Sequence, residues 1–228
     1  MEPIVLDRIP FKVDLAKLVQ TMRLAPDGEP ARMLPALAAA AEALGRPTGL
    51  YGVAFIEERG LDFAVIDGVR FQSRVLAVNF APVHRVFPFV VSCGPELDVW
   101  AAGFRDGLER YLAEGVKGEG LRLAIEAVSA DLDRRFEPGS VAMMNPGSLP
   151  DWPLPEQRQL FRLLGDTRAA IGVELLESCF MSPNLSVSGI AFASGEGYQN
   201  CSLCPREKCP GRRAPHDGEM FARKYRKG

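Results

Sequence analysis

Apolar residues recur at helical spacing in two stretches near the start of the chain, residues 15–22 and residues 29–44. Apolar positions three and four apart fall on one face of a helix, where they pack against a core. The pattern therefore predicts two amphipathic helices. Gly45 follows the second stretch, at the position where glycine commonly ends a helix.

Farther along, the spacing changes to that of strands. Apolar runs at residues 61–66 and 69–71 flank the pair Asp67-Gly68. An Asp-Gly pair between two β-rich runs favours a tight turn, because both residues tolerate the backbone conformation that such turns need. The sequence therefore predicts a β-hairpin here.

Residues 86–91 are almost entirely apolar and predict a buried strand. Within it, Pro88 indicates a bulge or an edge position, because proline has no N–H group to donate to a neighbouring strand. Three more strands are predicted at residues 5–11, 171–176 and 186–192.

Two long helices are predicted at residues 97–111 and 121–132, each with one apolar stripe, and a short one at residues 156–164. Residues 137–155 are rich in proline and glycine and predict a loop. Because helices and strands do not alternate regularly, we expect an α+β fold with a mainly antiparallel twisted sheet flanked by helices.

The composition, 47% hydrophobic and 25% charged, is typical of a globular protein. The net charge of -2 is unevenly distributed, since residues 200–228 hold eight lysines and arginines against three acidic residues. This suits docking to an acidic partner or a solubilising end. We therefore divide the chain into an α+β domain, residues 1–196, and a cysteine-rich loop with a basic tail, residues 197–228.

Residues 1–11 carry three charges and lack the apolar run of a signal peptide, and no stretch approaches the length of a transmembrane helix. We expect a cytoplasmic protein with reduced thiols, and neither a membrane nor a nucleic-acid partner. The sequence contains no catalytic triad, zinc-hydrolase motif or dinucleotide-binding fingerprint. An independent hydrolase or dehydrogenase is therefore not expected.

Three cysteines, Cys201, Cys204 and Cys209, follow the spacing C-x2-C-x4-C. Thiolates are ligands for soft metals, and an odd total of five cysteines fits metal binding better than a set of disulfides. Pro205 and Pro210 follow two of the three, which indicates a loop that wraps around a ligand.

A zinc ion or an iron–sulfur cluster normally takes four ligands. Cys179 is the candidate for the fourth, with a small buried core residue as the alternative interpretation. His216 would instead complete a zinc site of three cysteines and one histidine. The spacing does not distinguish a [4Fe-4S] cluster from zinc.

Cys93 precedes Gly94-Pro95 at the start of a predicted helix, a place where a thiol can act as a nucleophile. The chain has two histidines, His84 and His216, so a Cys-His pair has little material. We interpret Cys93 as a packing residue.

Several short motifs follow one another in the second half of the chain. They are Asn145-Pro146-Gly147, Pro155-Glu156, Leu176-Glu177-Ser178, Met181-x-Pro183 and Ser186-Val187-Ser188-Gly189. Their order resembles the reactivation domain of cobalamin-dependent methionine synthase, which binds S-adenosylmethionine. A weaker similarity lies at Leu6-Asp7-x-Ile9-Pro10. The agreement covers about a fifth of the chain.

The resemblance implies a role in returning oxidised cobalamin to service by reductive methylation. It implies a corrinoid protein or methyltransferase as partner, together with an electron donor. It also implies ligand contacts from Asp7, Asn145, Pro146, Gly147 and Glu177.

Two positions depart from the family pattern. Met143 stands where the family has an arginine, and Ser148 stands where it has a tyrosine. An arginine pairs with a carboxylate in a way that methionine does not, so weaker binding of S-adenosylmethionine is expected.

Three hypotheses follow. The first is an accessory redox protein for a corrinoid-dependent methyltransferase, with the cysteines holding a [4Fe-4S] cluster. The second is a non-enzymatic interaction module stabilised by zinc. The third is a methyl-donor domain that binds S-adenosylmethionine, as in the parent family.

Overall fold

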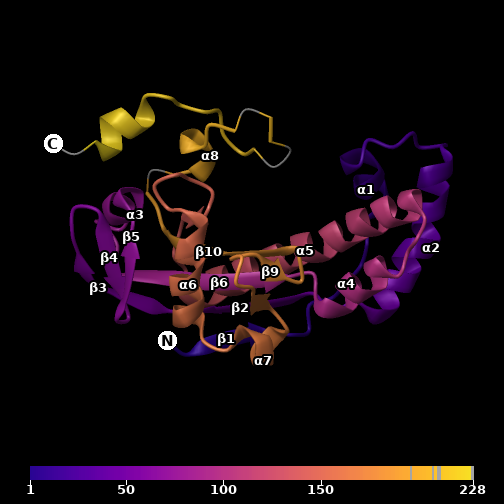
Figure 1. Ribbon diagram of the computed structural model, residues 1–228, viewed down its shortest axis with the longest axis horizontal. Coiled ribbons are helices and arrows are strands. Elements are labelled where there is room, and N and C mark those ends of the chain that lie inside the picture. The colour runs from indigo at the N-terminus through magenta and orange to yellow at the C-terminus, as the bar shows by residue number, and fades with distance from the viewer. Residues whose placement is uncertain (196, 207, 210–211, 227–228) are drawn as a thin grey trace.

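The computed structural model describes residues 1–195, 197–206, 208–209 and 212–226 (Figure 1). The strands are β1 (Pro3–Leu6), β2 (Thr48–Gly52), β3 (Ala54–Arg59), β4 (Phe63–Ile66), β5 (Val69–Gln72), β6 (Arg85–Ser92), β7 (Val141–Met144), β8 (Glu174–Leu175), β9 (Met181–Ser182) and β10 (Ser186–Ala193). The helices are α1 (Leu15–Thr21), α2 (Glu29–Leu44), α3 (Arg74–Asn79), α4 (Pro95–Ala102), α5 (Gly107–Phe136), α6 (Gln157–Leu164), α7 (Thr167–Ile171) and α8 (Asn200–Leu203). A 3₁₀ turn at Leu154–Glu156 precedes α6, and a π-helical turn lies at Phe221–Tyr225.

The central strand of the sheet is β6, which pairs with β10 along one edge and with β2 and β3 along the other. β7 lies outside β10, β1 lies outside β2, and β4 and β5 continue beyond β3. Every pairing among the described strands is antiparallel. The predicted α+β fold with an antiparallel sheet is confirmed.

The position of Pro88 was predicted wrongly, since β6 is neither an edge strand nor bulged there. The N–H of Cys93 bonds to Leu185 on the β10 side, and bonding alternates along an antiparallel strand. The backbone nitrogen of Pro88 therefore points toward β2 and β3. These two strands are separated by Val53, which belongs to neither of them. The missing N–H group coincides with a break in the ladder.

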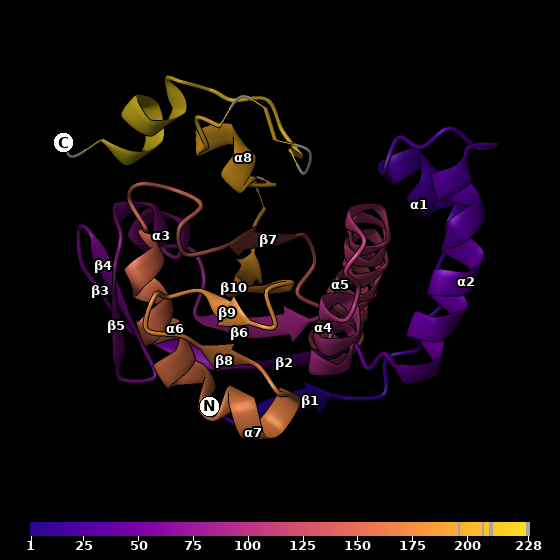
Figure 2. The same ribbon diagram turned by 45° about the vertical axis from the view of Figure 1, so that its right-hand side comes forward.

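Helix α5 covers one face of the sheet and continues past its edge to α1, α2 and α4 (Figures 1 and 2). The apolar cluster under α5 contains Tyr51, Phe87, Phe89, Val128 and Leu132. The opposite face of the sheet packs against α3, α6 and the loop after β7, in a larger cluster around Trp152.

The two long helices were predicted with the wrong boundaries. α4 ends at Ala102, and one helix of 30 residues, α5, follows it. Asp106 starts α5, because its carboxylate accepts the N–H groups of Leu108 and Glu109 at 2.9 and 3.0 Å. Inside α5, Gly115 lies where a Cβ atom would come within 2.3 Å of Met22 Sδ. Close packing explains this glycine.

Three strand predictions need correction. β1 ends at Leu6 and does not reach residue 11. β7 lies within the predicted loop, and residues 171–176 hold the end of α7 and the two-residue strand β8. Gly172 ends α7 with φ +70°, a conformation that favours glycine. The α2 helix, the hairpin at Asp67-Gly68 and β10 are confirmed.

The C-terminal segment packs onto the rest of the chain and runs above α3 and β10 in both figures. Tyr198, Leu203 and Tyr225 are buried in the same cluster as the sheet. Tyr225 Oη donates to Asn79 Oδ1 at 2.9 Å, and Arg74 Nε donates to the Tyr225 carbonyl at 3.2 Å. No helix among the described residues is both long and apolar enough to cross a membrane.

Candidate functional site

A cavity of about 770 Å³ opens beside the edge strand β7, and we name it the thiol cavity. One wall is largely apolar and comes from the sheet and α5: Phe89, Ile125, Val141, Met143 and Val187. A second wall is the loop after β7, with Asn145, Gly147, Ser148, Leu149 and Leu154. The third is the C-terminal segment, with Tyr198, Gln199, Asn200, Cys201, Cys204, Arg206, Cys209 and Arg213.

The loop after β7 is a tight turn built on the Pro-Gly motif. Gly147 has φ +80°, and its N–H donates to the Trp152 carbonyl at 2.8 Å. A Cβ atom at Gly147 would contact Leu154 at 3.1 Å, so this position favours glycine twice over. Asn145 Nδ2 donates to the Ser188 carbonyl at 2.8 Å, which ties the loop to β10.

The cysteines line the thiol cavity from the C-terminal segment. The prediction of a loop is wrong at Cys201, which lies in the one-turn helix α8. Cys204 follows the last residue of this helix, with its N–H bonded to the Asn200 carbonyl at 3.1 Å. The backbone N–H of Arg213 donates to Cys201 Sγ at 3.3 Å. All three thiols of the sequence cluster are half-buried and line this one cavity.

The structure therefore brings together two motifs that are far apart in the sequence. Asn145 and Gly147 share the thiol cavity with Cys201, Cys204 and Cys209. Met143 and Ser148, the two departures from the family pattern, line the same cavity, whereas Pro146 does not.

Cys179 does not join the other cysteines. It lies in the turn between β8 and β9 with φ +65°, its N–H bonded to the Leu176 carbonyl and its side chain buried. In both figures the β8–β9 hairpin lies apart from α8. Proximity in sequence to the motif thus did not translate into proximity to the thiol cavity.

The described residues do not form a complete metal site. Among the described residues, no three histidine, cysteine or acidic side chains lie close enough together to hold a metal ion. His216, the other candidate ligand, is exposed and lines a neighbouring cavity of about 450 Å³. As it stands, the segment supplies three thiols on one wall and not a closed set of four ligands.

Asp7 and Glu177 also lie outside the thiol cavity. Asp7 is exposed after the edge strand β1. Glu177 is exposed in the β8–β9 turn, where its backbone carbonyl accepts Arg158 Nη2 at 2.7 Å. The five ligand contacts implied by the family resemblance are therefore spread over separate parts of the surface.

Sequence reasoning missed the basic side of the cavity. Arg206 and Arg213 line it, and none of its described lining residues is acidic. Asn200 Nδ2 is buried without a hydrogen-bond partner in the described part of the chain. The excess of positive charge after residue 200 was visible in the sequence, but its place in the fold was not.

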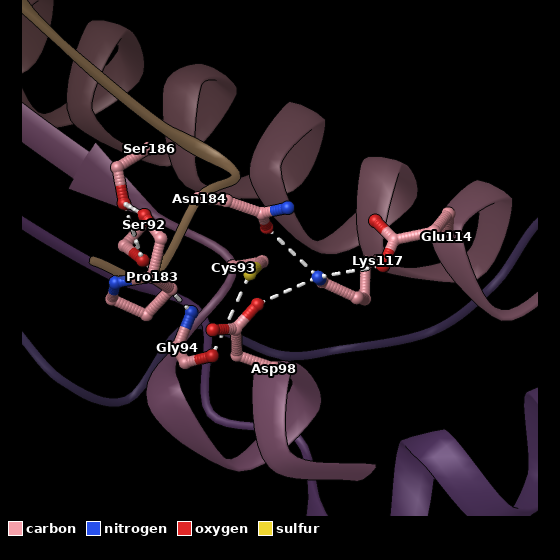
Figure 3. A network of polar contacts seen from close by, with 9 residues as sticks. All are labelled: Ser92, Cys93, Gly94, Asp98, Glu114, Lys117, Pro183, Asn184 and Ser186. Atoms are coloured by element: carbon pink, nitrogen blue, oxygen red, sulfur yellow. Dashed lines mark hydrogen bonds and ion pairs between the residues drawn. The ribbon is translucent and has the colours of Figure 1, made fainter. Parts of the chain in front are cut away.

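A polar cluster around Lys117 connects the loop before β10 to the helices (Figure 3). Lys117 Nζ donates to Asp98 at 2.7 Å, Glu114 at 3.1 Å and Asn184 at 2.9 Å. Burial lowers the pKa of this ammonium, but the two carboxylates outweigh burial and the pKa is raised. The cluster ties the loop before β10 to α4 and α5.

Comparison with known proteins identifies the fold. No family model and no curated protein matches this chain. Among solved structures, the chain is similar to the MetH reactivation domain bound to AdoHcy, with a TM-score of 0.68 and 16% sequence identity. The match covers 87% of this chain and 80% of that one. The predicted resemblance is confirmed as a likeness of fold.

Proposed function

We propose that this chain is an accessory protein in the reductive reactivation of a corrinoid-dependent methyltransferase of the methionine synthase type. The likeness of fold to the MetH reactivation domain supports this proposal. The observation that carries it further is the thiol cavity, which the Pro-Gly loop lines together with Cys201, Cys204 and Cys209.

The cysteines give the proposal its chemistry. Reactivation of cob(II)alamin needs one electron at the cobalt, and a [4Fe-4S] cluster held by thiolates is a group that supplies electrons at low potential. Cys201, Cys204 and Cys209 would be three of its ligands, and Cys179 stays the proposed fourth. Because Cys179 lies in a separate hairpin, its participation requires the β8–β9 turn and α8 to approach each other.

The charges suit such a partner. Arg206 and Arg213 stand at the thiol cavity, and the basic segment continues beyond it. A positive surface speeds encounter with an acidic one and makes that encounter sensitive to salt. We expect the corrinoid protein to present an acidic surface to this side of the molecule.

Anaerobic purification followed by iron, sulfide and zinc analysis tests the redox proposal. Stoichiometric iron and sulfide, lost in Cys201→Ser and Cys204→Ser but kept in Cys93→Ser, supports it. A colourless protein with one zinc and no iron overturns it in favour of a zinc-stabilised interaction module. Cys179→Ser decides the fourth ligand, since unchanged metal content removes that assignment.

Binding of S-adenosylmethionine is the second candidate, favoured by the AdoHcy in the similar structure. The cavity here offers Met143 and Ser148 instead of the family's arginine and tyrosine, and no described acidic lining residue faces a sulfonium cation. We therefore expect AdoHcy, which lacks that cation, to bind at least as tightly. Calorimetry with both ligands tests this, and no heat from either at high concentration removes the candidate.

A further inference from the structure

The guanidinium of Arg212 lies inside the cysteine segment and donates to four backbone carbonyls. Nη1 donates to Cys201 at 2.8 Å and to Ala214 at 3.1 Å. Nη2 donates to Cys204 at 3.0 Å and to Arg206. The backbone N–H of Arg212 also bonds to the Cys209 carbonyl, at 3.2 Å.

Between Cys201 and Arg206, regular structure is confined to the end of α8. α8 is a single turn, and a helix end leaves carbonyl groups without intrahelical partners. A planar guanidinium with five donors can satisfy several of them at once and links backbone that is distant along the chain. Arg212 thus holds residues 201–206 and residue 214 around one side chain.

The backbone beside Arg212 also contacts a cysteine sulfur atom. The residue after Arg212 directs its backbone N–H at Cys201 Sγ, 3.3 Å away. Hydrogen bonds to sulfur stabilise bound thiolates and tune the metal that they hold. The orientation of this N–H depends on the backbone that Arg212 fixes.

We propose that Arg212 is the positioning residue of the thiol segment. It holds Cys201 and Cys204 on the wall of the thiol cavity, and aims the Arg213 N–H at Cys201, before any metal arrives. The inference rests on the proposed function only for what the thiols bind. The arrangement itself belongs to the metal-free protein.

The test compares three full-length variants. Arg212→Gln removes the fork of donors, and Arg212→Lys keeps the charge without the planar fork. Arg213→Gln is the matched control for the exchange measurement, because it removes an equal charge from the next residue. The Arg213 side chain makes no hydrogen bond to the described residues, and its one contact with Cys201 comes from the backbone. The substitution leaves the backbone N–H in place.

The first measurement is amide hydrogen exchange of the metal-free protein over residues 200–206. Arg212→Gln is expected to raise these rates about tenfold or more, and Arg213→Gln to leave them within about twofold. Equal rates in Arg212→Gln and Arg213→Gln overturn the proposal. Because no metal is present, this result does not depend on the proposed function.

The second measurement is a Co²⁺ titration followed by the thiolate-to-cobalt charge-transfer absorption. Arg212→Gln is expected to weaken Co²⁺ binding by about 10- to 100-fold, as loss of a residue that orients ligands commonly does. Arg212→Lys, which keeps the charge, is expected to recover part of this loss. Equal Co²⁺ affinity in Arg212→Gln and wild type overturns the positioning role. Absence of any Co²⁺ band in wild type instead counts against the metal site, and the exchange rates then decide the role of Arg212.

Discussion

Cys93 and the three cysteines of the thiol cavity place the same side chain in two opposite environments. Cys93 is fully buried between β6 and α4, with Sγ 3.5 Å from the Gly94 carbonyl. Burial raises the pKa of its thiol to about 12, although the nearby Lys117 ammonium acts to lower it. Cys201, Cys204 and Cys209 are half-buried on the wall of a cavity. The first environment keeps a thiol inert, and the second makes thiols available to a ligand.

The polar groups around the two environments differ in the same way. Lys117 is 1% exposed and donates hydrogen bonds to side chains of α4, α5 and the loop before β10. Arg212 is half-buried and bonds to backbone carbonyls of its own segment. One cation locks the body of the fold together, whereas the other shapes a local loop.

Among the changes that test this comparison, removal of the Lys117 charge is expected to lower the free energy of unfolding the most. Lys117→Met keeps the volume but leaves Asp98 and Glu114 without their cation. Loss of one partner from a buried ionic cluster costs about 3–5 kcal/mol, and these carboxylates are 32% and 38% exposed. We therefore expect the low end, about 3 kcal/mol of unfolding free energy in urea.

A matched control for this substitution is Lys12→Met. Lys12 also pairs with a carboxylate, that of Glu42, but its side chain is 84% exposed. Exposed pairs contribute about 0–1 kcal/mol. If the two variants lose the same stability, the buried Lys117 cluster stabilises the fold no more than an exposed ion pair does.

Thiol labelling measures the contrast between the two environments directly. In the native, metal-free protein, iodoacetamide is expected to modify Cys201, Cys204 and Cys209. Cys93 and Cys179 are buried, so their labelling awaits opening of the structure and is expected to be roughly a hundredfold slower or more. Mass spectrometry at each site gives the rates. Rapid labelling of Cys93 in the folded protein would contradict its assignment as a packing residue.

Local signals predicted much of the fold but little of the site. The α2 helix and the Asp67-Gly68 hairpin follow from spacing and turn chemistry alone. The meeting of Asn145 with the cysteines depends instead on β7 pairing with β10, a contact between distant segments. Cys179 shows the same limit, because its nearness to a motif in sequence says nothing of which side a hairpin faces.

The roles of individual residues were hardest to see. Arg212 and Arg213 are adjacent and identical in the sequence. In the fold one side chain holds four carbonyls, while the other lines the cavity. A difference of this kind follows from backbone geometry, which residue type and spacing do not record.

The smallest expected effect is the contribution of Cys93 to the pH dependence of stability. The variant Cys93→Ala removes this contribution. In the unfolded chain the thiol ionises near its ordinary pKa of 9.0, whereas in the folded protein it keeps its proton to about 12. The folded-state pKa is raised, so this contribution is fully present below pH 9 and is lost as the pH rises toward 12. Each pH unit in that window removes about 1.4 kcal/mol. Urea unfolding at pH 8 and pH 10 should therefore show a smaller loss for Cys93→Ala than for wild type, while Cys204→Ala, which keeps Cys93, should match wild type. Equal losses in all three proteins would mean that Cys93 titrates alike in both states, and the contrast between the buried thiol and the cavity thiols would then rest on exposure alone.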